Sequence, residues 1–285
     1  MAPRGGYVKP AGRQAAHTRP HTAGTLLLIE KNVLTLAYFI FDNRKIYYKI
    51  KGIGEPVLLL HGNSASSRMF SSLLNKYSKD FQIITIDFPG HGKSDRLETF
   101  DTDFWFYNSE VTNALIEELQ FDKVTVIGTS GGALVAINLG LEHPEKIKYI
   151  IADSFEGEFP LPSYIESIES DRERDKKKLS AKLFWWYCHG HDWKRIVDLD
   201  TKVIVKFSET GKSFFHKSIS ELKVPALLTG SLKDEYCDHI DKIYADLKKK
   251  NDRLEIHLFE KGNHPAMISN KDEFFKIIKN KILSH

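Results

Sequence analysis

Short apolar runs recur along the chain from about residue 33, and stretches with helical spacing lie between them. Two β-rich segments flank Asp42-Asn43 and predict a hairpin. Several of the later runs are wholly apolar, which is typical of strands buried on both faces. The predicted strands are Val33–Phe41, Lys45–Lys51, Val57–Leu60, Phe81–Ile86, Val124–Ile127, Ile147–Ile151, Val224–Thr229 and Leu254–Phe259, and the predicted helices are Trp105–Leu119, Ala133–Leu141, Asp238–Lys249 and Lys271–Leu283.

This alternation predicts an α/β protein with a parallel sheet covered by helices on both faces. The alternation stops between about residues 156 and 218, where the sequence predicts a helical insertion between two halves of one sheet. Within the insertion, Asp171–Lys178 is a mixed-charge run typical of a solvated helix face. The aromatic residues Phe184–Tyr187 either pack within the insertion or line a pocket for the acyl part of a substrate.

Residues 128–132 read Gly-Thr-Ser-Gly-Gly and fit the pattern G-x-S-x-G. The pattern follows a predicted buried strand and precedes a predicted helix, which is the setting of a nucleophile elbow. Glycines permit the tight turn that lifts a serine hydroxyl out of the sheet, toward the positive end of the following helix. Ser130 is therefore the candidate nucleophile.

A serine hydroxyl needs a general base, and in this architecture the chain order is serine, acid, histidine. His264 lies in a loop just after a predicted strand, where ligand-facing residues collect in α/β folds. Asp234 follows the preceding strand and is the candidate acid that orients His264. Glu235 and Asp153 are alternative acids.

The reaction also needs hydrogen-bond donors for the developing oxyanion. The backbone N–H of Gly131, directly after the nucleophile, is the first candidate. The second comes from the loop after His61, where we expect the N–H of Asn63, with Ser64 as the alternative.

Together these motifs resemble the α/β-hydrolase family from about residue 33 to the end. His61-Gly62 is similar to the oxyanion-loop motif of that family, and residues 87–95, Asp-Phe-Pro-Gly-His-Gly-Lys-Ser-Asp, are similar to its D-x-P-G-x-G-x-S turn. The resemblance implies a mostly parallel eight-stranded sheet with a small helical cap after the sixth strand. Within the family, the short cap and the length resemble the esterase branch that includes valacyclovir-hydrolase-like proteins.

The resemblance implies a serine hydrolase that cleaves carboxylic esters through an acyl-enzyme, without a cofactor or a metal. The same residues would also suit a proline aminopeptidase, a thioesterase or a C–C bond hydrolase, because substrate choice depends on the cap. A non-catalytic ligand-binding protein of this fold is a third alternative. The expected partner is a small-molecule substrate.

The chain of 285 residues carries 41 Lys and Arg against 38 Asp and Glu, a net charge of +3. Residues 1–24 contain four basic residues and no acid, so the remainder stands at 37 against 38. The predicted domain, residues 25–285, is thus nearly neutral, which gives no support to nucleic-acid binding. Residues 1–24 are expected to be a disordered tail or a non-native extension.

The cysteines and the apolar segments bear on metal binding and location. Cys188 and Cys237 form no C-x-x-C pair, so a thiolate metal centre is not expected, and a reducing, cytoplasmic environment is the default. Residues 189–192, His-Gly-His-Asp, imitate a metal-binding box without its further histidine. The most apolar early segment, Thr25–Phe41, is interrupted by Glu30-Lys31-Asn32, so no membrane span is predicted.

Overall fold

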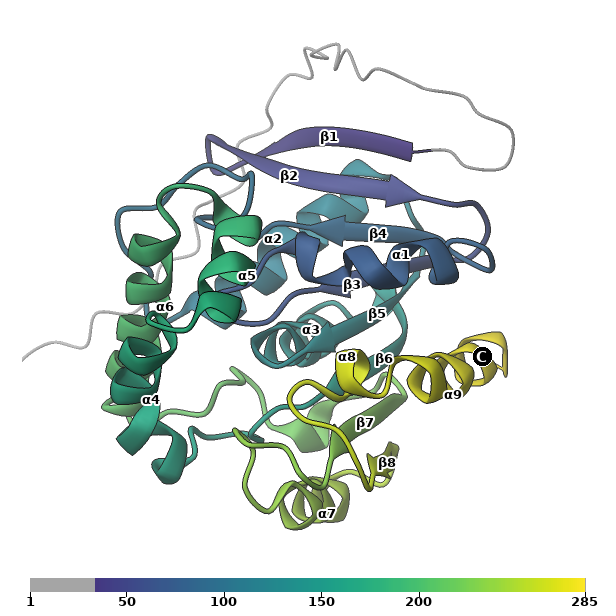
Figure 1. The fold of residues 1–285 in the computed structure, drawn as a ribbon. Helices are drawn as coiled ribbons and strands as arrows, with labels where there is room; N and C mark the ends of the chain where they lie inside the picture. The colour runs from purple at the N-terminus through teal and green to yellow at the C-terminus, as the bar shows by residue number, and fades with distance from the viewer. Residues whose placement is uncertain (1–33, 285) are drawn as a thin grey trace, which may run out of the picture.

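The computed structural model describes residues 34–284, which are built around one eight-stranded sheet (Figure 1). The strand order is β1-β2-β4-β3-β5-β6-β7-β8. Strand β2 is antiparallel to both of its neighbours, whereas β3 to β8 run parallel, as the resemblance implied. The strands are β1 (Leu34–Phe41), β2 (Arg44–Lys51), β3 (Pro56–Leu60), β4 (Gln82–Ile86), β5 (Val124–Thr129), β6 (Ile147–Asp153), β7 (Ala226–Ser231) and β8 (Leu254–Phe259).

Helices cover both faces of the sheet because the central strands are apolar on both faces. In β3, Val57 and Leu59 pack into one core cluster while Leu58 and Leu60 pack into the other, as the alternation of side chains along a strand requires. One face is covered by α1 (Ser71–Tyr77), α8 (Ala266–Ser269) and α9 (Lys271–Ser284), and the other by α2 (Phe104–Glu118), α3 (Gly131–Glu142) and α7 (Ile240–Lys250). Short 3-10 turns occur at η1 (Ser67–Phe70), η2 (Pro144–Lys146) and η3 (Ile219–Glu221).

Three further helices lie between β6 and β7, inside the stretch where the sequence alternation stops. They are α4 (Pro162–Asp175), α5 (Leu179–His189) and α6 (Trp193–Ser208). Figure 1 shows them grouped at one end of the sheet, and we refer to them as the cap. The cap packs through contacts of α6 with α4 and α5, and α5 also contacts η1.

The strands and helices predicted from the sequence each begin and end within two residues of the observed bounds. Helix α1 was not predicted, because seven residues give too short a pattern to separate a helix from a loop. The expected tail, residues 1–24, lies outside the described residues.

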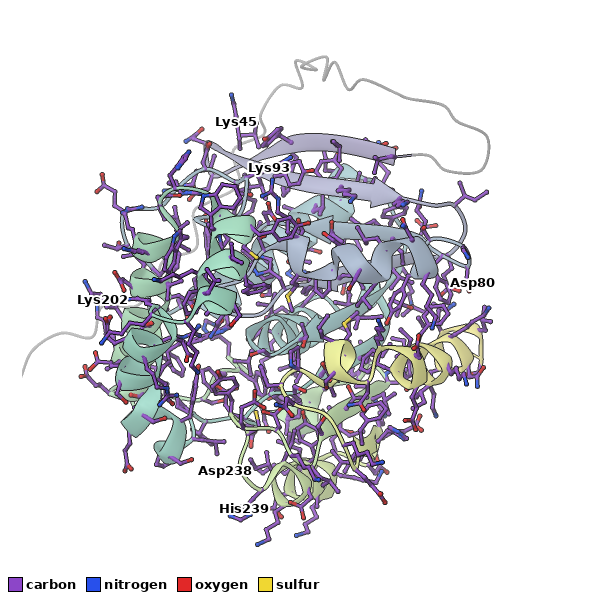
Figure 2. All side chains as sticks on the ribbon, in the orientation of Figure 1. Lys45, Asp80, Lys93, Lys202, Asp238 and His239 are labelled. Carbon is purple, nitrogen blue, oxygen red and sulfur yellow. The ribbon has the colours of Figure 1, made fainter. Side chains whose placement is uncertain are left out.

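Charged side chains lie mainly on the outside of the molecule, where Lys45, Asp80 and Lys202 are all exposed (Figure 2). Among the helices that the structure describes, none combines the length and apolar character needed to cross a bilayer.

Candidate functional site

The predicted site residues follow four parallel strands, so the fold gathers them at one edge of the sheet. Asn63 follows β3, Ser130 follows β5, Asp234 follows β7 and His264 follows β8. The carboxyl ends of parallel strands meet at one edge, where ligands bind in α/β folds. Ser130, Asn63 and His264 line a pocket of about 370 Å³ whose other wall comes from the cap helices α4 and α5. Asp234 lies buried behind His264.

Ser130 sits at a sharp turn between β5 and α3. Its φ of 55° and ψ of −127° are unusual for a residue with a side chain, and its backbone N–H donates a 2.7 Å hydrogen bond to the carbonyl of Asp153. The turn depends on close backbone packing, because a Cβ atom at Gly128 would lie 2.0 Å from the carbonyl oxygen of Gly132. This geometry is that of a nucleophile elbow, with the hydroxyl at the start of a helix.

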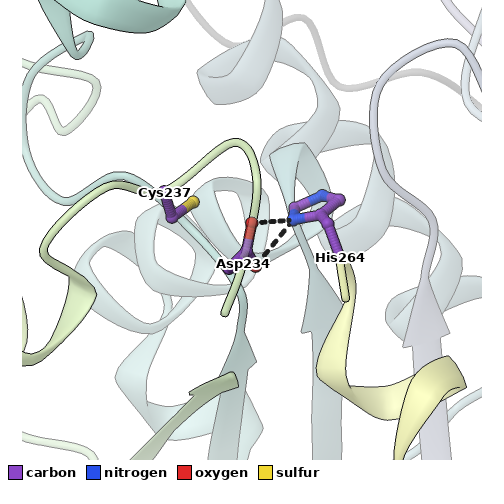
Figure 3. Close-up of side chains that lie close together, drawn as sticks. All are labelled: Asp234, Cys237 and His264. Atoms are coloured by element: carbon purple, nitrogen blue, oxygen red, sulfur yellow. Dashed lines mark hydrogen bonds and ion pairs between the residues drawn. The ribbon is translucent and has the colours of Figure 1, made fainter. Parts of the chain in front are cut away.

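The imidazole of His264 is bound to Asp234 (Figure 3). Its Nδ1 lies 2.9 Å from Oδ2 and 3.1 Å from Oδ1 of the carboxylate. Burial raises the pKa of Asp234, but the hydrogen bond and charge of His264 outweigh burial and hold that pKa below its ordinary value. An ionised Asp234 keeps the proton on Nδ1, so Nε2 can act as a base.

The two alternative acids occupy other positions. Glu235 accepts a 2.9 Å hydrogen bond from the backbone N–H of His264 rather than from its ring. Asp153 is fully buried and accepts hydrogen bonds of 2.9 Å from two threonine hydroxyls, and burial raises its pKa to about 6. Of the three carboxylates, Asp234 is therefore the one that the structure places on the imidazole.

The loop after β3 passes directly over the elbow. A Cβ atom at Gly62 would lie 2.9 Å from the Cβ of Ser130, and one at Gly131 would lie 2.0 Å from Oδ1 of Asn63. The Asn63 side chain also accepts a 3.3 Å hydrogen bond from Nε1 of Trp105. The two expected oxyanion donors are thus on adjacent backbone segments beside the serine.

The cap contributes pocket residues that sequence reasoning missed. Arg172 belongs to the run predicted to be a solvated helix face, yet its side chain is only 18% exposed and lines the pocket. That prediction was wrong for Arg172 because α4 turns one side toward the sheet, although Glu173, Arg174, Lys177 and Lys178 are exposed. The other polar cap-side and loop residues of the pocket are Ser64, Glu156, Tyr164, Asp175, Tyr236 and Cys237.

The aromatic run of the cap divides between two roles. Trp185 is buried, and both Trp185 and Phe184 line the pocket, while Trp186 and Tyr187 are exposed. Trp185 thus combines packing against Trp193 with pocket lining, whereas Phe184 lines the pocket while 40% exposed. No sequence signal separates them, since the direction of each ring depends on how α5 lies on the rest of the protein.

Asp234, Cys237 and His264 bring a carboxylate, a thiol and an imidazole within 4.8 Å of one another (Figure 3). These are zinc-ligand types. However, Nδ1 of His264 already binds Asp234, and burial, together with the negative charge of Asp234, raises the pKa of the Cys237 thiol well above its ordinary value. A metal ion would have to displace that hydrogen bond and the thiol proton, so the group fits a proton-handling role better than a metal site.

Comparison with known proteins gives consistent results. Residues 55–173 match a family model described as alpha/beta hydrolase fold. The solved structure of an E-2-(acetamidomethylene)succinate hydrolase superposes with a TM-score of 0.70 over 87% of this chain and 99% of that one, at 17% identity. At this level of identity, the similarity is one of fold.

The curated relatives differ in how much of their own length this chain matches. A serine hydrolase-like protein from Danio rerio is 35% identical over 99 residues, which are 34% of this chain but only 30% of that protein. Three further relatives align over 39% to 48% of their own length. A proline iminopeptidase from Clostridioides difficile is 25% identical over 86% of this chain and 97% of its own.

Proposed function

The chain has the α/β-hydrolase fold, and we propose that it is a serine hydrolase of carboxylic esters. In this proposal Oγ of Ser130 attacks the ester carbonyl while Nε2 of His264 takes its proton. The backbone N–H groups of Gly131 and Asn63 stabilise the tetrahedral oxyanion, and each contributes about 3 kcal/mol to lowering the barrier. The C–O bond then breaks, His264 protonates the departing alcohol, and an acyl-enzyme remains on Ser130.

Deacylation repeats these steps with water in place of the serine. His264 removes a proton from water, the hydroxide attacks the acyl carbonyl, and Ser130 leaves with the proton. Asp234 stays ionised throughout and stabilises the imidazolium formed in each half-reaction. The proposed chemistry needs no cofactor.

The observation that carries the proposal is the bond between His264 Nδ1 and Asp234 at the same pocket as Ser130. With Nδ1 bound to Asp234, Nε2 is the ring nitrogen left to act as the base, at a pocket that Ser130 also lines. The alternative acids have other partners, which supports Asp234 in the orienting role.

A second candidate is release of an N-terminal proline from peptides. It is favoured by the match to a protein named proline iminopeptidase over nearly that protein's entire length. The pocket residue Glu156, whose pKa is raised to about 7 chiefly by burial, could accept hydrogen bonds from a substrate amine when ionised. Thioester and C–C bond cleavage are further alternatives that involve the same residues, but the group that leaves and takes the proton is a thiol or a carbon instead of an alcohol.

Burst kinetics test the ester proposal. With a p-nitrophenyl ester, we expect a rapid release of one equivalent of p-nitrophenol, labelling of Ser130 by a fluorophosphonate, and loss of both in Ser130→Ala. Turnover of Ser130→Ala at the wild-type rate would contradict the mechanism. A panel of esters, thioesters and proline arylamides then separates the candidates, and a clear preference for a non-ester would overturn the substrate class.

A further inference from the structure

Ser64, next to the proposed oxyanion donor Asn63, is held by side chains from the cap. Ser64 is 2% exposed and has a φ of 52°, in the left-handed region that most side chains avoid. Such a conformation persists when surrounding contacts fix it. Those contacts come from helices inserted about a hundred residues later in the chain.

Arg172 and His189 bind two different groups of Ser64. Nη1 of Arg172, near the end of α4, donates a 2.6 Å hydrogen bond to its Oγ. Nε2 of His189, at the end of α5, lies 3.0 Å from its carbonyl oxygen. Because Nδ1 of His189 accepts the N–H of Gly92 at 3.1 Å, the ring proton is on Nε2 and donates to Ser64.

His189 remains neutral in this arrangement. Burial lowers its pKa to about 4, although the hydrogen bond to Ser64 acts in the opposite direction. One ring nitrogen is therefore a fixed acceptor and the other a fixed donor at neutral pH. His189 thus connects the Ser64 loop to the turn at Gly92, both of which belong to the sheet domain.

The third cap helix, α6, contributes Asp200. Its carboxylate is fully buried, with Oδ2 located 4.0 Å from Nη2 of Arg172. Burial raises the pKa of Asp200 to about 7, whereas Arg172 and the backbone N–H of Ser64 lower it. Asp200 therefore faces Ser64 and lies beside the Arg172 guanidinium that binds Ser64.

We propose that Arg172 and His189 are positioning residues through which the position of the cap determines the geometry of the oxyanion hole. With the cap in place, they fix Ser64 and so keep the preceding N–H, that of Asn63, directed at the reacting carbonyl. This inference rests on the proposed function. We call Arg172 and His189 together the clamp. The inference implies that loss of either clamp residue weakens binding of the transition state more than binding of the substrate.

A double-mutant cycle between Arg172 and Ser64 tests the coupling. Arg172→Met and Ser64→Ala each remove one partner of the same hydrogen bond. We expect each to lower kcat for a p-nitrophenyl ester by about tenfold to a hundredfold, and the double variant to be no slower than the worse single variant. KM should change by less than about threefold, and affinity for a boronic acid that mimics the tetrahedral intermediate should fall in parallel with kcat/KM.

Two controls accompany the cycle. Arg174→Met changes an exposed arginine on the same helix, and its activity should remain at the wild-type level. Arg172→Lys keeps a donor and should recover part of the lost kcat. If Arg172→Met does not fold, as judged by its melting curve, His189→Ala replaces it and should show the same selective loss of kcat.

Two results would overturn the clamp. A raised KM with unchanged kcat would make Arg172 a substrate-binding residue. Additive effects in the cycle would mean that Arg172 does not act through Ser64. Fluorophosphonate labelling of wild-type Ser130 is measured alongside, because failure to label would refute the serine mechanism itself, whereas additivity in a protein that labels refutes only the clamp.

Discussion

His264 is subject to opposing influences on its proton affinity. Burial lowers the pKa of its imidazole, but the hydrogen bond and charge of Asp234, with the charges of Asp153 and Glu235, outweigh burial and raise it above its ordinary value. A general base must be neutral to accept a proton. Activity should therefore rise with pH, with a midpoint above about 6.5.

Replacing Asp234 with asparagine removes the negative charge of Asp234 and its charged hydrogen bond, the two largest influences that raise the His264 pKa, and leaves only the weaker charges of Asp153 and Glu235 against burial, which lowers it. In Asp234→Asn we expect the midpoint of the kcat/KM profile to move to lower pH and kcat to fall by about a thousandfold or more, because the tautomer is no longer fixed. The measurement is kcat/KM on a p-nitrophenyl ester from pH 5 to 9.

Glu235→Gln is the matched control, because Glu235 accepts a hydrogen bond from the backbone N–H of His264 rather than from its ring. Its kcat should stay within about threefold of the wild type, since the bond can be kept by the amide oxygen. A larger loss in Glu235→Gln than in Asp234→Asn would assign the orienting role to Glu235 instead.

The residues that could be predicted from the sequence are those whose backbone setting is local. Ser130 lies within five residues that define its turn, and His264 follows from chain order and a strand end. Arg172 could not be found in this way. Its position in the pocket depends on which side of α4 faces the sheet, and a mixed-charge sequence does not define that side.

At the scale of elements, the junction of β5 and α3 leaves no room for a side chain at either of two glycines. Gly132 lies under the end of β3, where a Cβ atom would meet the carbonyl oxygen of Leu60 at 2.3 Å. Gly128 faces Gly132 in the same way. These are backbone contacts, so no side-chain rotation can relieve them.

Gly128→Ala should therefore destabilise the protein by about 3 kcal/mol, because β5 and α3 must separate to admit the methyl group. The free energy of unfolding is measured by urea titration. Gly211→Ala is the control, because a Cβ there meets nothing within 4 Å and only its φ of 62° opposes the change. That control should lose about 1 kcal/mol. Equal losses in the two variants would mean that the junction is looser than its contacts imply.

Elements were predicted well where a strand is buried on both faces, because a short unbroken apolar run between turn residues is typical of such strands. The cap helices were anticipated only as a helical stretch. Helix α6 carries buried apolar residues at helical spacing, among them Ile196, Val203 and Phe207, but α4 has no comparable pattern. Within α4, the only buried residue is Ile168, so there is almost no apolar stripe to recognise.

At the scale of the whole molecule, the net charge of the chain does not describe the charge of its larger part. The +3 of the chain comes from residues 1–24, whereas residues 25–285 carry 37 basic and 38 acidic side chains. Many of the charged side chains in the described part form exposed ion pairs, such as Lys76 with Asp272 and Lys279 with Asp80. A nearly neutral surface of this kind provides little long-range steering of a charged ligand.

Deleting residues 1–24 should consequently leave catalysis unchanged. Every site residue lies beyond position 60, and a neutral ester does not respond to the four positive charges that are lost. We expect kcat/KM of the shortened protein to agree with that of the full chain within about twofold at both low and high ionic strength. A large loss at both ionic strengths would mean that this segment contributes to the site by contact, while a loss only at low ionic strength would mean that its charge does.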